Sequence, residues 1–229
     1  ILIDQAESPL YNLQQEFTSF KFINQHFIVA DIRNKKRMAH IFDEYKPEII
    51  FHAAAYKHVP LMEDNTYEAV KTNIIGSINL MDLAIDKKVD KFVMISTDKA
   101  VNPTNVMGAT KRIAEMYTMC LKDNGNTKFI TTRFGNVLGS NGSVVPLFKR
   151  QIEAGGPITV THKDITRYFM TIPEACQLVL EAGAMGKGDE IFVFEMGKSI
   201  KIFDLALKMI QLSGLKYPDE MDIKIVGLR

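Results

Sequence analysis

The stretch Lys91-Phe-Val-Met-Ile-Ser-Thr-Asp-Lys99 decides the fold. Its apolar run, Phe92 to Ile95, ends in small polar residues and is typical of a fully buried strand of a parallel sheet. Thr97, Asp98 and Lys99 then stand at the carboxyl end of the strand, where open α/β sheets bind their ligands. A hydroxyl, a carboxylate and an ammonium at that edge can transfer protons. The stretch therefore predicts a parallel α/β sheet with Thr97, Asp98 and Lys99 as candidate catalytic residues.

A helix is predicted directly after this strand, beyond the turn at Asn102-Pro103, with its start near Asn105. Met107 and Lys111 are four residues apart on this helix, so they share one face. We expect this helix to bring Lys111 to the same cleft as Asp98 and Lys99.

The block from Ser96 to Lys111 resembles the signature of bacterial nucleotide-sugar dehydratases of the capsular-polysaccharide (CapD-like) family, a branch of the extended short-chain dehydrogenases/reductases. The resemblance implies a UDP-N-acetylglucosamine 4,6-dehydratase, which gives a UDP-4-keto-6-deoxy sugar for capsule, O-antigen or glycan biosynthesis. The implied fold is an α/β Rossmann-type doubly wound parallel sheet that lacks its first βα unit. Residues 1–140 would form the NAD-binding domain, its sheet completed by about 170–197, and residues 141–169 and 198–229 a partial substrate-binding lobe.

The composition is that of an ordinary globular protein. The 229 residues are 46% hydrophobic and 24% charged, with a net charge of +1, which argues against a nucleic-acid partner or a membrane-surface footprint. No run is long enough to span a membrane. We expect a cytoplasmic segment, although segments outside this chain can anchor the parent protein to the inner membrane. Cys120 and Cys176 lie in apolar helix patterns and are expected to be free, buried thiols.

Asp4 ends a short predicted strand, Ile1-Leu-Ile-Asp4, that opens the chain without a methionine. We expect a fragment of a longer protein, cut at both ends. In dinucleotide-binding folds an acidic residue at this point bonds the adenosine ribose, which favours NAD over NADP because a 2′-phosphate would meet a like charge. A plain turn aspartate is the alternative. No G-x-G-x-x-G motif occurs in the chain, so we expect the glycine-rich turn upstream of Ile1.

The next two predicted strands end in further cofactor candidates. Asp31 and Ile32 resemble the family's adenine contact, with the carboxylate on the exocyclic amine and the isoleucine on the ring face. Ala53, Ala54 and Ala55 are small enough to let the backbone approach a cofactor closely. The loop that follows resembles the segment that lines the nicotinamide and sugar, so Lys57 is a candidate substrate or ribose contact. His52 and His58 have no metal ligands at suitable spacing beside them, so no metal is expected.

Three further polar residues resemble functional positions of the family. Asn73 stands where short-chain dehydrogenases carry an asparagine beneath the active site, and we expect it to belong to the cofactor-binding site. The alternative is a buried side-chain amide that is hydrogen-bonded to the backbone. Asn136 resembles the residue that meets the nucleotide-sugar. Arg167 resembles an arginine near the same ligand, or it pairs with Asp164.

The proton chemistry must differ from that of ordinary short-chain dehydrogenases, which use Tyr-x-x-x-Lys. Here Met107 replaces the tyrosine, while Lys111, which holds the nicotinamide ribose in the family, is retained. Our hypothesis is that Asp98, directly or through Thr97, takes the proton from the hydroxyl on carbon 4 while NAD takes the hydride. Lys99 then removes the proton on carbon 5, and Asp98 helps water leave from carbon 6. Met107 is kept as a substrate contact.

Two other functions stay open at this point. A UDP-sugar 4-epimerase shares the fold and the hydride step but normally keeps the tyrosine, whereas Thr97-Asp98-Lys99 favours dehydration. A non-catalytic nucleotide-sugar or NAD-binding fragment is the second, because the glycine motif is absent. We also expect a homo-oligomer.

Overall fold

The computed structural model describes residues 1–20, 24–122, 125–140 and 142–227. The chain divides into two compact units: unit 1 comprises 1–131 and 186–191, and unit 2 comprises 132–185 and 192–229. The boundary predicted from the sequence lies after residue 140, nine residues later than this division, and of the predicted completing segment, about 170–197, the division assigns only 186–191 to unit 1.

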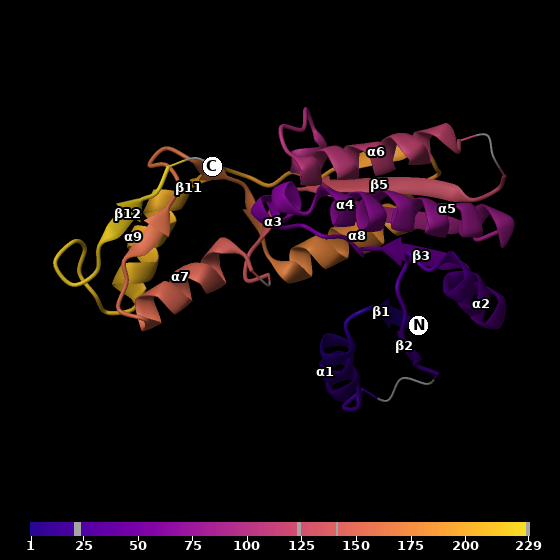
Figure 1. Ribbon diagram of the computed structural model, residues 1–229, viewed down its shortest axis with the longest axis horizontal. Helices are drawn as coiled ribbons and strands as arrows, with labels where there is room; N and C mark the ends of the chain where they lie inside the picture. Colours follow the sequence, from indigo (N-terminus) through magenta and orange to yellow (C-terminus); the bar gives the residue numbers. More distant parts are fainter. Residues whose placement is uncertain (21–23, 123–124, 141, 228–229) are drawn as a thin grey trace. The chain divides into compact units, whose positions relative to one another are not determined.

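A four-stranded sheet contains the stretch that decides the fold (Figure 1). Its order is β10-β5-β4-β3, with bounds Glu190–Val193, Lys128–Phe134, Lys91–Thr97 and Ile49–His52. β3 and β4 pair in parallel, with Phe51 opposite Val93. Phe92, Val93 and Met94 have no exposed surface. The predicted buried strand and the Rossmann-type α/β fold are therefore confirmed.

A separate two-stranded sheet holds the amino-terminal residues of unit 1. β1 (Leu2–Asp4) and β2 (Phe27–Val29) pair in parallel and are joined through α1 (Glu7–Phe17). Within the described residues, β1 pairs only with β2, and β3 pairs only with β4. In the part of the chain that the structure describes, one edge of β1 and one edge of β3 therefore have no partner strand.

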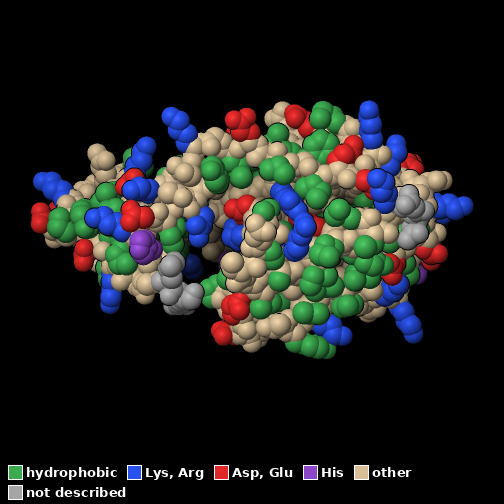
Figure 2. Space-filling model, turned by 90° about the horizontal axis from the view of Figure 1, so that it is seen from above, with side chains coloured by type: hydrophobic (Ala, Val, Ile, Leu, Met, Phe, Trp, Pro, Cys, Tyr) green, Lys and Arg blue, Asp and Glu red, His purple; other side chains and the backbone are tan. Residues whose placement is uncertain are grey.

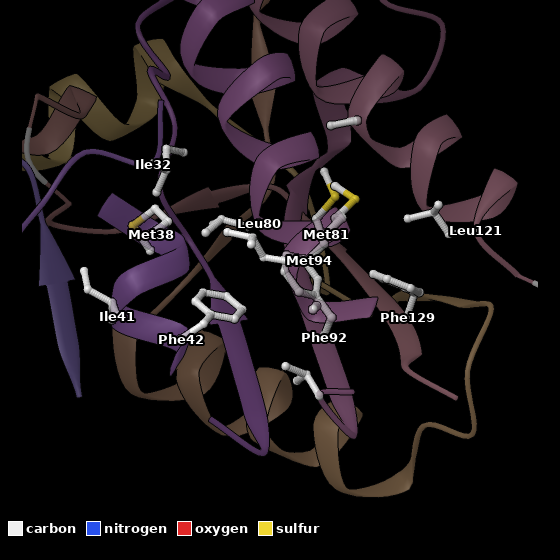
Figure 3. Packing of buried hydrophobic residues seen from close by; sticks show 14 of the residues in the cluster. Ile32, Met38, Ile41, Phe42, Leu80, Met81, Phe92, Met94, Leu121 and Phe129 are labelled. Carbon is white, nitrogen blue, oxygen red and sulfur yellow. The ribbon is translucent and has the colours of Figure 1, made fainter. Parts of the chain in front are cut away.

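The core of unit 1 lies between the sheet and three helices, α2 (Lys35–Tyr45), α5 (Ser77–Asp86) and α6 (Val106–Cys120). Met38, Ile41 and Phe42 of α2 are buried, and Figure 3 shows them gathered with Leu80 of α5. The ring of Phe92 lies between those of His52 and Phe129, with centroids 5.7 and 5.6 Å away. The aromatic and aliphatic packing is the main stabilising contribution to this unit.

The crossover between β3 and β4 is helical but irregular. α3 (Val59–Asp64) and α4 (Thr66–Ala69) lead into a π-helix, η1 (Val70–Gly76), which continues as α5. π-helical turns are rare and occur frequently at functional sites. Gly76 allows a close approach here, because a Cβ at this position would lie 2.6 Å from the side chain of Ile32. The periodicity of the sequence predicts one helix through this region but not the π-helical turn.

Unit 2 is built from short strand pairs and three helices. The parallel pairs are β6 (Asn136–Val137) with β9 (Phe169–Met170) and β7 (Ile158–Val160) with β12 (Ile223–Ile225); β8 (Thr166–Arg167) and β11 (Ile200–Lys201) are antiparallel. The helices are α7 (Val144–Glu153), α8 (Ile172–Met185) and α9 (Ile202–Leu212). Phe148, Ile158 and Ile210 are among its buried core residues.

The surface mixes apolar and charged side chains. Figure 2 looks down on the side where α6 lies uppermost in Figure 1, and hydrophobic side chains are exposed there among lysines, arginines and acids. On α6, Ile113, Met116 and Met119 are each about half exposed. Cys120 and Cys176 are free but exposed, so the prediction of buried thiols is wrong. Both lie on outward faces of their helices, where apolar side chains continue around the helix. No helix in the described ranges is long and apolar enough to cross a membrane.

Candidate active site

The turn at the carboxyl end of β4 brings three predicted catalytic residues into contact. Asp98 to Ala100 form a short 3₁₀ helix, η2. Thr97 Oγ1 donates to Asp98 Oδ1 at 2.9 Å, and Lys99 Nζ donates to the same oxygen at 3.1 Å. The side chains of Asp98 and Lys99 are about one third exposed (35% and 29%). The cluster therefore presents a hydroxyl, a carboxylate and an ammonium at the ligand-binding edge of the sheet.

α6 begins directly beside this turn. Asn105 caps the helix, since its Oδ1 accepts from Gly108 N at 2.8 Å, as expected for an asparagine at this position. A Cβ on Gly108 would collide with the carbonyl oxygen of Lys99 and lie 3.2 Å from Cβ of Pro103. The absence of a side chain at residue 108 therefore lets the first turn of α6 pack against η2.

Lys111 is buried and bound to the strand that carries the turn. Its side chain donates from Nζ to the carbonyl oxygen of Ile95 at 2.6 Å. Burial lowers the pKa of Lys111 to about 8, opposed in part by the buried carboxylate of Glu115. A lysine with such a pKa exchanges its proton close to neutral pH. The structure thus holds the side chain of Lys111 against Ile95, which precedes Thr97 by two residues on β4. That Lys111 shares a cleft with Asp98 and Lys99 stays a prediction.

Met107 occupies the position that is tyrosine in ordinary short-chain dehydrogenases. Its side chain is 4% exposed and packs in a small cluster with Met62, Ala69 and the ring of Tyr56. The contacts are apolar, which suits a thioether that donates no proton. A contact of Met107 with substrate stays a prediction.

Asn73 fixes the loop that follows β3. Its Oδ1 accepts from Tyr56 N at 2.8 Å, and its Nδ2 donates to Tyr56 O and to Thr110 Oγ1, both at 3.0 Å. The side chain is completely buried. It therefore ties the π-helix to α6 and to the backbone just before Lys57, whose pKa is lowered by partial burial. The expected buried amide bonded to backbone is confirmed, and a direct contact of Asn73 with a cofactor stays a prediction.

His52 extends this buried network. Its Nε2 lies 2.8 Å from Ser77 Oγ, which donates to the carbonyl oxygen of Asn73 at 2.8 Å. Burial, and then the charge of Lys111, lowers the pKa of His52 to about 3. The ring is therefore neutral at physiological pH, and it supports Asn73 from β3. This structural role of His52 was not predicted; the position of the residue at the end of an apolar strand is the signal in the sequence that indicates it.

A pocket of about 190 Å³ lies at the carboxyl ends of β1, β2 and β3. It brings together six of the residues predicted to bind cofactor: Asp4, Asp31, Ile32, Ala53, Ala54 and Ala55. The remaining lining is apolar, from alanines and isoleucines, apart from Gln5 and Thr72. Parallel strands meet their ligands at this edge, so the pocket supports the predicted position of a dinucleotide.

Thr72 also lines this pocket and was not among the predicted site residues. The residue is 4% exposed, and Oγ1 has no hydrogen-bond partner among the described residues. Buried hydroxyls are normally paired, so an unpaired one in a pocket is a candidate ligand contact. Thr72 adjoins Asn73 in sequence, and that proximity was the only signal for it.

The two acids of the pocket have different partners. Asp31 pairs with Arg33 at 2.6 Å, and hydrogen bonding from Arg33 lowers the pKa of Asp31. Arg33 also pairs with Glu68 at 2.7 Å. Asp4 accepts from the amide of Ala6 at 2.8 Å, so it does form the turn foreseen as its alternative role, while it also lines the pocket.

The remaining substrate candidates belong to unit 2. Asn136 lies in β6, and its backbone N–H donates to the carbonyl oxygen of Tyr168 at 3.1 Å. Arg167 is exposed and donates to the carbonyl oxygen of Thr166 at 2.8 Å. The carboxylate of Asp164 pairs instead with Lys201 at 3.4 Å, so the alternative Arg167–Asp164 pair is not formed. Ligand binding by Asn136 and Arg167 stays a prediction.

This fold and this sheet edge define a Rossmann-type α/β protein. Two solved structures are similar. Pen from Bacillus thuringiensis has a TM-score of 0.91 and 38% identity, and the match covers 99% of this chain and 69% of that one. A double mutant of DesIV, a dTDP-glucose 4,6-dehydratase from Streptomyces venezuelae solved with NAD, has a TM-score of 0.85 and 19% identity, and the match covers 96% of this chain and 71% of that one. The second likeness shows the fold alone.

The particular family follows from sequence. A family model described as polysaccharide biosynthesis protein matches residues 1–229, and the chain belongs to this family. The capsular polysaccharide biosynthesis protein CapD of Staphylococcus aureus is 55% identical over the whole of this chain. The match covers 39% of CapD, so the chain spans about two fifths of the length of that relative.

Proposed function

We propose that this chain is the cofactor-binding and catalytic part of a nucleotide-sugar 4,6-dehydratase that converts UDP-N-acetylglucosamine into a UDP-4-keto-6-deoxy sugar. The observation that carries the proposal is the contact cluster of Thr97, Asp98 and Lys99 at the carboxyl end of β4. Membership of the polysaccharide biosynthesis family and the high identity with CapD support a role in making surface glycans.

The residues of the 190 Å³ pocket fit the adenosine half of NAD. The three alanines leave room for close approach, and the buried hydroxyl of Thr72 has a free hydrogen-bonding capacity. Asp4 disfavours a 2′-phosphate by like charge, and Arg33 is already held by two carboxylates. These features favour NAD over NADP. A bound NAD would supply hydride transfer, with carbon 4 of the sugar as the source of the hydride and carbon 6 as its destination.

The chain's own residues then move protons in a balanced sequence. Both hydrogen bonds to Asp98 end on Oδ1, so among the described residues Oδ2 is the oxygen left to accept the proton of the hydroxyl on carbon 4. Lys99, as the neutral amine after its ammonium has released a proton, takes the proton from carbon 5. Asp98 gives its proton to the hydroxyl that leaves carbon 6 as water, and Lys99 returns a proton to carbon 5. A carboxylic acid and an amine in contact suit these two tasks.

Substitution of Asp98 in the longer natural protein tests this assignment. Asp98→Asn keeps the shape but removes the proton acceptor, so we expect formation of the 4-keto-6-deoxy product to fall by about 10²–10⁴-fold. Binding of the UDP-sugar, measured by calorimetry, should be unchanged. Asp90→Asn, at the amino end of the same region and exposed, is the matched control. Normal turnover of Asp98→Asn would exclude the assignment.

The same assay separates dehydration from 4-epimerisation. An epimerase returns a sugar of unchanged mass, whereas a dehydratase product has lost water, and mass spectrometry distinguishes the two. Met107, which cannot act as the usual tyrosine, favours dehydration. Self-association of the protein and membrane attachment of the longer polypeptide are further parts of this proposal, and the exposed Ile113, Met116 and Met119 of α6 support the first.

A further inference from the structure

The buried face of α6 contains two opposite charges, Lys111 and Glu115. Lys111 is 5% exposed and Glu115 is completely buried. The two residues are four positions apart, so they share one face of the helix, with Cβ atoms about 5–6 Å apart. Lysine and glutamate are almost never buried to this extent unless they are paired. Their presence together on a core-facing stripe therefore needs a physical reason.

The hydrogen bond that Lys111 makes does not neutralise its charge. Nζ donates to the carbonyl oxygen of Ile95 at 2.6 Å, and a carbonyl group is a neutral acceptor. Burial lowers the pKa of Lys111, and the carboxylate of Glu115 opposes this effect. Glu115 is thus the negative charge on the same helix face that favours the ammonium form of Lys111.

Arg112 binds Glu115 from the outer side of α6. Its Nη1 lies 3.2 Å from Oε2 of Glu115, and its side chain is 40% exposed. An exposed glutamate could form the same pair along the helix, so the pair with Arg112 alone does not explain why this carboxylate is fully buried. Burial places the carboxylate on the face of Lys111, in a low-dielectric region where attraction between charges is stronger.

Other charged groups near α6 are engaged elsewhere. Acidic side chains on the elements that pack against this helix have partners of their own: Glu63 with the amide of Val106, Glu68 with Arg33, Asp82 with Tyr117, and Asp98 with Lys99. Lys71 of η1 lies over the ring of Tyr67, and His52 of β3 is neutral at physiological pH. In the part of the chain that the structure describes, Glu115 is the one carboxylate that is buried.

We infer that Glu115 is a positioning residue whose buried carboxylate keeps Lys111 in its ammonium form beside the carboxyl end of β4, while Arg112 balances Glu115 from the surface. An ammonium has three N–H donors, and the bond to Ile95 uses one of them. The remaining donors can hold hydroxyl groups of a ligand. This use of Lys111 rests on the proposed function, whereas the control of its charge by Glu115 does not.

Titration of Lys111 by NMR tests the charge assignment without any substrate. The 229-residue chain is labelled with ¹³C at the ε-carbons of lysine, and Lys111→Met identifies the signal. The pKa of Lys111, about 8 in the wild type, should fall by at least about 1 in Glu115→Gln, which keeps the shape and removes the charge. Glu115→Asp should restore most of the wild-type value.

Arg112→Gln provides a test of opposite sign. Removal of its positive charge should raise the pKa of Lys111, by less than Glu115→Gln lowers it, because Arg112 is partly exposed to solvent. Glu153→Gln, which removes an exposed carboxylate paired with Lys149 on α7, is the matched control and should leave the Lys111 titration unchanged. Circular dichroism checks that each variant is folded, and either Glu115→Gln or Arg112→Gln decides the sign if the other does not fold.

The pH profile of the longer natural protein tests the positioning role. Product formation should decline above the pKa of Lys111, and this alkaline limb should move to lower pH in Glu115→Gln by the same amount as the titration. A Lys111 pKa that Glu115→Gln leaves unchanged or raises would overturn the inference, as would shifts in one direction for Glu115→Gln and Arg112→Gln, or an alkaline limb that does not move. If the titrations agree but no 4-keto-6-deoxy product forms, the proposed function fails while the charge assignment stands.

Discussion

The buried Lys111 gives the most quantitative prediction. The residue is 5% exposed, and its ammonium donates to the carbonyl oxygen of Ile95. Lys111→Met keeps the aliphatic stem in place and removes the charge. We expect the variant to be at least as stable as the wild type at pH 7 and to lose one component of the pH dependence of stability.

The magnitude follows from the pKa. The ordinary lysine pKa is 10.5, and burial lowers that of Lys111 to about 8; this difference corresponds to roughly 3 kcal/mol. Because the folded pKa lies below the unfolded one, the unfolded chain binds more protons between pH 8 and 10.5. The free energy of unfolding therefore rises with pH across this window. Below pH 8 it is lowered by the full cost of burying the charged ammonium of Lys111. In Lys111→Met, loss of the hydrogen bond to Ile95 cancels about 1–3 kcal/mol of the stability gained by removing the buried charge. The variant should therefore be more stable than the wild type by about 1 kcal/mol at pH 7.

Urea unfolding followed by circular dichroism between pH 7 and 10.5 measures this effect. The wild type should gain stability across the window relative to Lys111→Met, and the two curves should cross as the wild-type lysine becomes neutral. Lys149→Met, at an exposed lysine paired with Glu153 across one turn of α7, is the control and should keep the wild-type slope. A wild type with no relative gain above pH 8 would refute the reasoning.

Three further predictions concern other described contacts. Asn73→Asp places a carboxylate against the carbonyl of Tyr56, so the urea midpoint should fall by the equivalent of about 2–4 kcal/mol. Gly108→Ala forces its new methyl group onto the carbonyl of Lys99 and should lower product formation by at least about 10-fold, while the circular dichroism spectrum is unchanged. Arg33 lowers the pKa of Asp31, so this pair stabilises the fold above the ordinary value of 3.8, and its contribution is lost as pH falls through the folded pKa. Arg33→Gln should therefore flatten the loss of stability in acid.

Each of these has a clear contrary result. An unchanged midpoint for Asn73→Asp would mean that its bonds to Tyr56 and Thr110 contribute little. Full activity of Gly108→Ala would show that the turn at Asp98 tolerates displacement. If Arg33→Gln loses stability in acid just as the wild type does, solvent screens the Arg33–Asp31 pair.

Much of this architecture is encoded locally. The apolar run of β4, the cap Asn105 of α6 and the Thr171–Glu174 capping box of α8 all follow from short-range patterns, and the structure confirms each; Glu174 N donates to Thr171 Oγ1, while Thr171 N donates back to Glu174. The predicted cofactor residues at strand ends meet in one pocket because parallel strands place their carboxyl ends together.

Other features depend on tertiary contacts that no local pattern reports. The hydroxyl of Thr72 is unpaired among the described residues because no neighbouring group in the fold provides a hydrogen-bond partner. The π-helix is a change of hydrogen-bonding register, which leaves apolar periodicity almost unaltered. The extended segment from Lys128 to Val137 divides into β5 and β6 at Gly135, where a Cβ would lie 2.9 Å from Sδ of Met196, more than sixty residues away. Such contacts between distant residues are set by the completed fold.

The two exposed thiols have a practical consequence. Cys120 belongs to unit 1 and Cys176 to unit 2, and the chain has no other cysteine. Maleimide chemistry can therefore attach a donor and an acceptor dye, or a pair of spin labels, to the unmodified sequence with one probe on each unit. Energy transfer or pulsed electron resonance would then report the separation of the units directly, and titration with a UDP-sugar would reveal whether ligand changes it.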